Sequence, residues 1–321
     1  MAPRLRFITA MKKLFVPTAI LTLFLFSCQS PYNSAAHLTS GDLGSGNLSQ
    51  GTPEDGSATQ PPKEETQDEV TQARPVFPPI LTPPEEVAPP RAVDFNTLVL
   101  ESLKEMPVGG GYSLGADAGR ALKKATSWKA DTLELFPKPA QPSYCSGATY
   151  ILFLKAILKA FPDLKTNERV AKKLLLLGQG DGVSVYGRWN ANGPGTARLF
   201  YELKIGRNFD SWEEAKPGDF MKIFWDSNIG KSEKGHSVVY LGTSIVKGVP
   251  MVEFWSSNQP GGYGSKKVEK SRVKRVIFSR VVDLQKILDA PALPEKDLYL
   301  ADMLKRASSP AEMAQMIDLN R

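Results

Sequence analysis

Residues 148–161 form a segment that is apolar on almost every side of the helix it predicts. Its sequence is Ala-Thr-Tyr-Ile-Leu-Phe-Leu-Lys-Ala-Ile-Leu-Lys-Ala-Phe. A surface helix carries one apolar stripe, whereas a helix that is apolar all round must be covered by other elements. The chain can therefore accommodate this segment only at the centre of its fold, with the remaining elements packed around it.

The elements around this segment predict an α+β fold. Amphipathic spacing predicts helices at 93–106, 116–127, 168–177, 196–205 and after Leu284. Runs of β-branched and aromatic residues predict strands at 219–225, 236–241, 250–256 and 273–282. Gly109-Gly110-Gly111 predicts a turn, and 180–195 predicts a loop. Helices followed by antiparallel strands, with extra helices at both ends, indicate the α+β class rather than a parallel sheet.

Composition limits the kinds of partner and cofactor. The chain has 41% hydrophobic residues, enough for one sizeable core, and a formal net charge of +6. We expect its basic stretch at 266–275 to be a solvated face of a strand or turn, and no nucleic-acid partner. The two cysteines and two histidines offer no zinc-binding spacing, and no metal or organic cofactor is implied.

The N-terminus predicts export and lipidation. Lys12 and Lys13 precede roughly fourteen mostly apolar residues, a length typical of a secretory signal and short of the roughly 20 that span a bilayer. Leu25-Phe26-Ser27-Cys28 resembles the lipobox of bacterial lipoproteins. The resemblance implies a signal peptide at 1–28, a lipid (palmitate among its acyl chains) on Cys28, and a cell-envelope location. Gln29 favours the periplasmic side of the outer membrane.

Residues 29–92 predict a disordered stalk, which leaves 93–321 as the folded domain. The stalk is first rich in glycine and serine and then in proline, and it cannot bury enough surface to offset its conformational entropy. Such a stalk reaches on the order of 100 Å. His37 lies in it and has no assigned role. A Cys28–Cys145 disulfide would cross this tether, and we rank it below lipidation.

Cys145 and His236 are the only cysteine and histidine of the predicted folded domain. Cys145 precedes the central helix, whose positive end favours a thiolate. His236 begins a predicted strand and would act as acid and base for the thiol. The alternative is a core cysteine and a structural histidine, which are common at such positions.

A histidine base needs a third group that fixes its orientation. Strand alternation at 252–258 places Asn258 and Ser256 on one face of the next strand and Glu253 on the other. We rank Asn258 first, then Ser256, with Glu253 as the electrostatic alternative.

Three short motifs in a fixed order carry a family resemblance. Cys145-Ser146-Gly147 resembles the signature of NlpC-like cysteine peptidases, which are papain-like cell-wall hydrolases. Pro217-Gly218-Asp219 is similar to the motif that introduces their first core strand. Gly235-His236 and the apolar residues after it resemble their catalytic-histidine strand, and the same order occurs in the related CHAP amidases.

The resemblance implies a papain-like domain in which a nucleophile helix packs on a small antiparallel sheet. It implies a thiol peptidase or amidase acting on peptidoglycan stem peptides or another peptide or amide substrate, bound to the membrane through the N-terminal lipid. Tyr144 replaces the usual Asp, and an insertion is expected at 165–210. The alternatives are a non-catalytic wall- or protein-binding lipoprotein on the same scaffold and a thiol acyltransferase.

Overall fold

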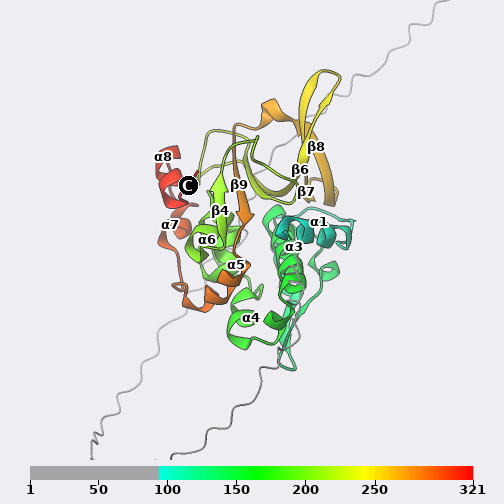
Figure 1. The fold of residues 1–321 in the computed structure, drawn as a ribbon, viewed down its shortest axis with the longest axis vertical. Helices are drawn as coiled ribbons and strands as arrows, with labels where there is room; N and C mark the ends of the chain where they lie inside the picture. Colours follow the sequence, from blue (N-terminus) through cyan, green and yellow to red (C-terminus); the bar gives the residue numbers. More distant parts are fainter. Residues whose placement is uncertain (1–93, 321) are drawn as a thin grey trace, which may run out of the picture. The chain divides into compact units, whose positions relative to one another are not determined.

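Helix α3 (Cys145–Ala160) lies at the centre of the fold in the computed structural model, which describes residues 94–320 (Figure 1). Apart from two lysines and the last alanine, every residue of this helix is buried. Tyr144 is extended, so the helix begins at Cys145. The expectation of a centrally packed helix at 148–161 is confirmed, and the cysteine occupies its first turn.

An antiparallel sheet of seven strands lies against α3. From edge to edge its order is β1, β8, β7, β6, β5, β9, β4, and neighbouring strands pair antiparallel. The bounds are β1 (Gly109–Gly110), β4 (Gly206–Phe209), β5 (Phe220–Phe224), β6 (Gly235–Val246), β7 (Val249–Asn258), β8 (Gly262–Glu269) and β9 (Arg275–Val281). The α+β class predicted from the sequence is therefore confirmed.

The two faces of the sheet carry separate apolar clusters. Because side chains alternate along a strand, neighbouring residues of β5, β6 and β7 belong to opposite faces. The face toward α3 includes Phe220, Val239 and Trp255, which share one buried cluster with that helix. The other face carries Met221, Val238 and Phe254.

Further helices surround this core. They are α1 (Phe95–Lys104), α2 (Ala116–Lys123), α4 (Glu168–Leu174), α5 (Ser184–Asn190), α6 (Gly195–Leu203), α7 (Leu298–Asp302) and α8 (Pro310–Met316). Short 3-10 helices are η1 (Lys138–Ala140), η2 (Pro162–Lys165), η3 (Lys270–Arg272) and η4 (Leu284–Ala292). The Phe153 ring of α3 stacks on Trp189 of α5 at 4.7 Å and meets Phe220 of β5 edge-on at 5.6 Å. These aromatic contacts tie α3 to both the helices and the sheet.

The sequence prediction was wrong at three segments. The helix predicted at 116–127 ends at Lys123, and a hairpin of β2 (Thr126–Lys129) and β3 (Thr132–Leu135) follows it. The predicted loop at 180–195 contains α5. The predicted glycine turn at 109–111 contains β1, which pairs with β8 at the sheet edge. In each case, pairing or packing with distant residues overrides the local signal.

Several expectations concern residues outside the described range. The signal peptide at 1–28, the lipidation site Cys28, the stalk at 29–92 and His37 all lie there. Within 94–320, no helix has the length and apolarity needed to cross a membrane.

Replacing Phe153 by Ala should destabilise the fold strongly. The ring is fully buried and contacts five other aromatic rings, so its removal leaves a cavity at the centre of the core. We expect a loss of about 3–5 kcal/mol in the free energy of unfolding, measured by urea denaturation. The control is Phe136→Ala, because Phe136 is exposed and its loss should cost roughly 0.5 kcal/mol or less. Equal losses in the two variants would contradict this account of the core.

Candidate active site

The N-terminal end of α3 lies where β6 begins and β7 ends. Ser257 Oγ donates a hydrogen bond of 2.8 Å to the Ser143 carbonyl, just before the helix. One turn into the helix, Thr149 Oγ1 and Ser237 Oγ lie 3.0 Å apart. Ser237 directly follows His236 in the chain, and Ser257 directly precedes Asn258. The first turns of α3 therefore pack against the end of the sheet at which β6 begins and β7 ends.

His236 and Asn258 form a direct cross-strand hydrogen bond. His236 Nε2 lies 3.1 Å from Asn258 Oδ1. Asn258 Nδ2 donates to the carbonyls of Gly264 at 2.7 Å and Ser256 at 3.2 Å, which fixes the orientation of the amide. Oδ1 is then the acceptor, so Nε2 carries the proton and Nδ1 has the lone pair. This tautomer leaves the basic nitrogen of the ring on the side away from Asn258.

The two alternative orienting residues have other partners. Ser256 Oγ donates to the Ser237 carbonyl at 2.7 Å. Glu253 forms an ion pair of 3.2 Å with Lys267 across β7 and β8. Of the three candidates for the third residue, Asn258 is therefore the one whose side chain forms the hydrogen bond with the His236 ring described above.

The environment of His236 favours the neutral imidazole. Burial lowers the pKa of His236 to about 4; the Asn258 hydrogen bond opposes this shift, and the charges of Lys266 and Lys222 add to it. The ring meets Phe254 edge-on at 5.6 Å, which accounts for part of its desolvation. At neutral pH the ring is therefore a proton acceptor.

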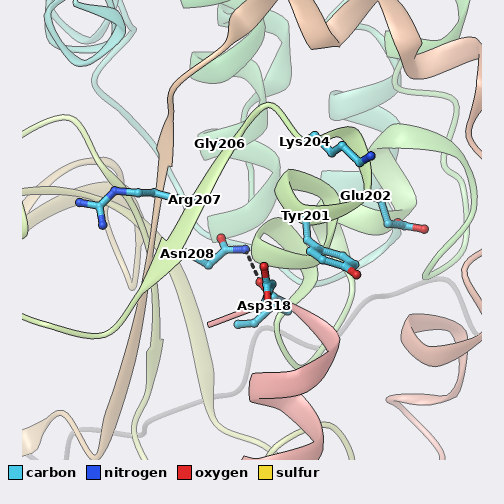
Figure 2. Close-up of a pocket in the computed structure, with 8 residues that line it drawn as sticks. Tyr201, Glu202, Lys204, Gly206, Arg207, Asn208 and Asp318 are labelled. Atoms are coloured by element: carbon cyan, nitrogen blue, oxygen red, sulfur yellow. Dashed lines mark hydrogen bonds between the residues drawn. The ribbon is translucent and has the colours of Figure 1, made fainter. Parts of the chain in front are cut away.

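Cys145 is fully buried and lines a small polar cavity. The cavity has a volume of about 10 Å³, which is the room needed for one water molecule. Its polar lining residues are Ser146, Asn190, Thr196, Lys222 and Ser237. Figure 2 shows a larger pocket of about 390 Å³ beside α6 and β4, which shares no lining residue with this cavity.

The Cys145 sulfur belongs to a disulfide, and the described residues contain no free thiol. Cys28, the other cysteine of the sequence, lies outside the described residues. From the sequence, a Cys28–Cys145 disulfide ranked below lipidation of Cys28. Lipidation would convert the Cys28 sulfur into a thioether, which cannot form a disulfide. Lipidation of Cys28 and a Cys28–Cys145 disulfide therefore exclude each other.

A buried ion pair beside Cys145 was not predicted from the sequence. Lys222 Nζ contacts Glu233 Oε1 at 2.6 Å, and Glu233 Oε2 accepts backbone N–H groups of Gly193 and Gly230, both at 2.7 Å. A Cβ at Gly235 would lie 2.7 Å from both the Lys222 ammonium and the Glu233 carboxylate. Gly235, directly before His236, is the sequence signal that could have indicated this pair, because the absence of a side chain there leaves room for the two charged groups.

Two further contacts place α5 against the helix start. Ser146 Oγ donates to Asn190 Oδ1 at 2.6 Å, and the Tyr144 and Tyr186 hydroxyls lie 2.6 Å apart. Neither contact was predicted, because the sequence of the segment that contains Tyr186 and Asn190 predicts a loop. Tyr144, which precedes the Cys145-Ser146-Gly147 motif, contributes its hydroxyl to this buried pair.

No protein-family model matches this sequence, and no curated protein or solved structure matches it significantly. Within residues 94–320, no group of three or more His, Cys, Asp or Glu side chains is arranged to hold a metal ion.

The depressed pKa of His236 should make the fold less stable in mild acid. The pKa falls from 6.5 to about 4 on folding, so the unfolded chain binds the proton more readily between these values. This contribution to stability is complete above about pH 6.5 and is lost as the pH falls toward 4, up to about 3 kcal/mol. Because the ring keeps partial contact with solvent, the loss should stay below that limit.

The measurement is the free energy of unfolding of the unchanged chain and of His236→Gln across this pH range. The slope attributable to His236 should be missing in the variant. His37→Gln removes the only other histidine and should keep the slope of the unchanged chain. A slope that survives His236→Gln would refute the assignment.

Proposed function

We propose that the chain is a thiol hydrolase of the bacterial cell envelope with a papain-like domain, which cleaves amide bonds in peptidoglycan stem peptides. The observation that carries the proposal is the His236–Asn258 hydrogen bond at the sheet end where α3 begins. It supplies an oriented base, and the next residue, Ser237, contacts the helix that begins at Cys145. The resemblance in motif order adds the substrate class.

The Pro217-Gly218-Asp219 motif supports the scaffold of this proposal. Asp219 is buried and accepts hydrogen bonds from Arg280 at 2.7 and 2.6 Å and from Asn96 at 2.8 Å. Gly218 has a φ of 95°, and a Cβ there would lie 2.7 Å from the Asn96 carbonyl. The motif therefore joins α1 to β5 and β9. Its role is to position strands, and it lies outside the proposed chemistry.

The proposed reaction proceeds through a thioester on reduced Cys145. The thiol proton passes to His236 Nδ1 as Sγ bonds to the substrate carbonyl carbon. The carbon–nitrogen bond then breaks, and the leaving amine takes the proton from Nδ1. Water next gives a proton to Nδ1 and its oxygen to the acyl carbon. The carbon–sulfur bond breaks, and the proton returns to Sγ.

The disulfide makes this activity conditional on reduction. A sulfur bonded to another sulfur has no thiol proton and cannot attack a carbonyl. The oxidised protein is accordingly inactive in this proposal. A thiol reductant would return Cys145 to the free thiol, and lipidation of Cys28 before oxidation would prevent a Cys28–Cys145 disulfide from forming. Asn258 acts through His236 and is a positioning residue.

A second candidate function is a non-catalytic binding lipoprotein on the same scaffold. Full burial of Cys145 and its disulfide favour this candidate, since both are properties of a structural cysteine. It predicts that reduction yields no hydrolysis. A thiol acyltransferase, in contrast, would attach an added amine to the acyl group in place of water.

The test is release of peptide fragments from purified peptidoglycan by the reduced full chain. Cys145→Ala should abolish release, and His236→Gln should lower kcat/KM by roughly 10²–10⁴-fold, since general acid–base catalysis contributes about that much. Asn258→Ala should lower activity less and should also shift its pH profile, because it acts on the orientation and basicity of the imidazole.

Cys28→Ser is the matched control, because it leaves Cys145 as the only cysteine. This variant should hydrolyse peptidoglycan without reductant, whereas the unchanged oxidised chain should require it. If the reduced chain and Cys28→Ser both fail to release fragments, the binding candidate replaces the hydrolase. Equal activity in Cys145→Ala would overturn the proposal as well.

A further inference from the structure

The hairpin between β6 and β7 ends in a cluster of exposed apolar side chains. Ile245 is 76% exposed, Val246 43% and Val249 39%. Val246 pairs with Val249, and Ile245 pairs with Pro250. Between them, Lys247 and Gly248 both have positive φ angles, 50° and 80°, as a tight two-residue hairpin turn requires. We call residues 245–250 the hairpin tip.

The hairpin tip is apolar on both of its faces. Alternation along the strands places the pair Ile245–Pro250 on one face and the pair Val246–Val249 on the other. A ribbon that packs on one neighbouring surface needs only one apolar face. In Figure 1 the hairpin that joins β6 to β7 is the yellow ribbon that extends past the labels β6, β7 and β8. An apolar medium that surrounds the tip would bury both of its faces, whereas a flat protein surface would bury only one.

Cationic residues flank the tip. Three cations lie close to it in the chain or in the sheet, Lys247, Lys270 and Arg272, whereas Arg275 pairs with Phe224 near the other end of β6. Lys247 lies in the turn itself. The last residue of β8, Glu269, pairs with Met251 beside the tip, and η3, which carries Lys270 and Arg272, directly follows it. Glu253 and Lys267 form an ion pair, so their charges offset each other. The charge around the tip is therefore complementary to an anionic surface.

We propose that the hairpin tip inserts into the interface of an anionic lipid bilayer. Its apolar pairs extend over two residues of each strand, about 7 Å at 3.3 Å per residue. Amphipathic segments that lie in the interface penetrate to about 5–10 Å, which matches this reach. Lysine and arginine beside the tip would bind the anionic headgroups, an attraction that weakens with salt. The insertion is independent of the proposed hydrolase chemistry.

The test places a tryptophan at the tip of the full chain with Val246→Trp. The variant is mixed with vesicles of phosphatidylglycerol and phosphatidylethanolamine that include lipids brominated in their acyl chains. Emission beyond that of the five native tryptophans should shift to shorter wavelength and lose intensity, because bromine quenches only at short range. The shift should be smaller with zwitterionic phosphatidylcholine vesicles and at high salt.

Leu298→Trp is the matched control, since Leu298 is 75% exposed on α7. Its emission should stay unchanged when the vesicles are added. Equal quenching at positions 246 and 298 would show that an anchor merely crowds the domain onto the bilayer, and would overturn insertion. Unchanged emission at position 246 would also overturn it, and would leave the tip to a protein partner. Equal quenching in anionic and zwitterionic vesicles would refute the role of the cationic flank.

Discussion

The burial of α3 is the interaction on which the rest of the structure depends. The Phe153 ring contacts aromatic rings from α1, α5, α6 and β5, so segments far apart in the chain meet on one side chain. The same packing sets the distance of the helix from the sheet along its whole length. The position of Cys145 relative to β6 and β7 thus depends on core packing as well as on the Ser143–Ser257 and Thr149–Ser237 contacts.

The sequence contained enough information for the elements whose periodicity is long and strong. Residues 148–161 have a composition that fits a central helix, and the four predicted strands all occur, because their β-branched runs are bounded by turn residues. The segments at 109–111 and 126–135 were missed. Gly109 and Gly110 form a strand only because β8 offers an edge, and no local pattern reports the presence of that edge.

For the candidate site, position along the strand was the useful physical rule. The expectation of a polar orienter at the end of the strand ranked Asn258 above Glu253, and Asn258 hydrogen-bonds His236 on the neighbouring strand β6. The Lys222–Glu233 pair could not be found in this way. Glu233 lies in the segment between β5 and β6. Only the folded arrangement of that segment brings its carboxylate to Lys222, to the nearby Gly230 N–H and to the distant Gly193 N–H.

The buried Glu233 carboxylate also limits how this chain can diverge. An isolated buried charge is costly, so a sequence that lost Lys222 would have to neutralise Glu233 at nearly the same time. A side chain at Gly235 would press on both members of the pair. These three positions should therefore change together in related sequences or not at all. Substitutions around His236 would then be limited by three neighbouring residues that take no part in its chemistry.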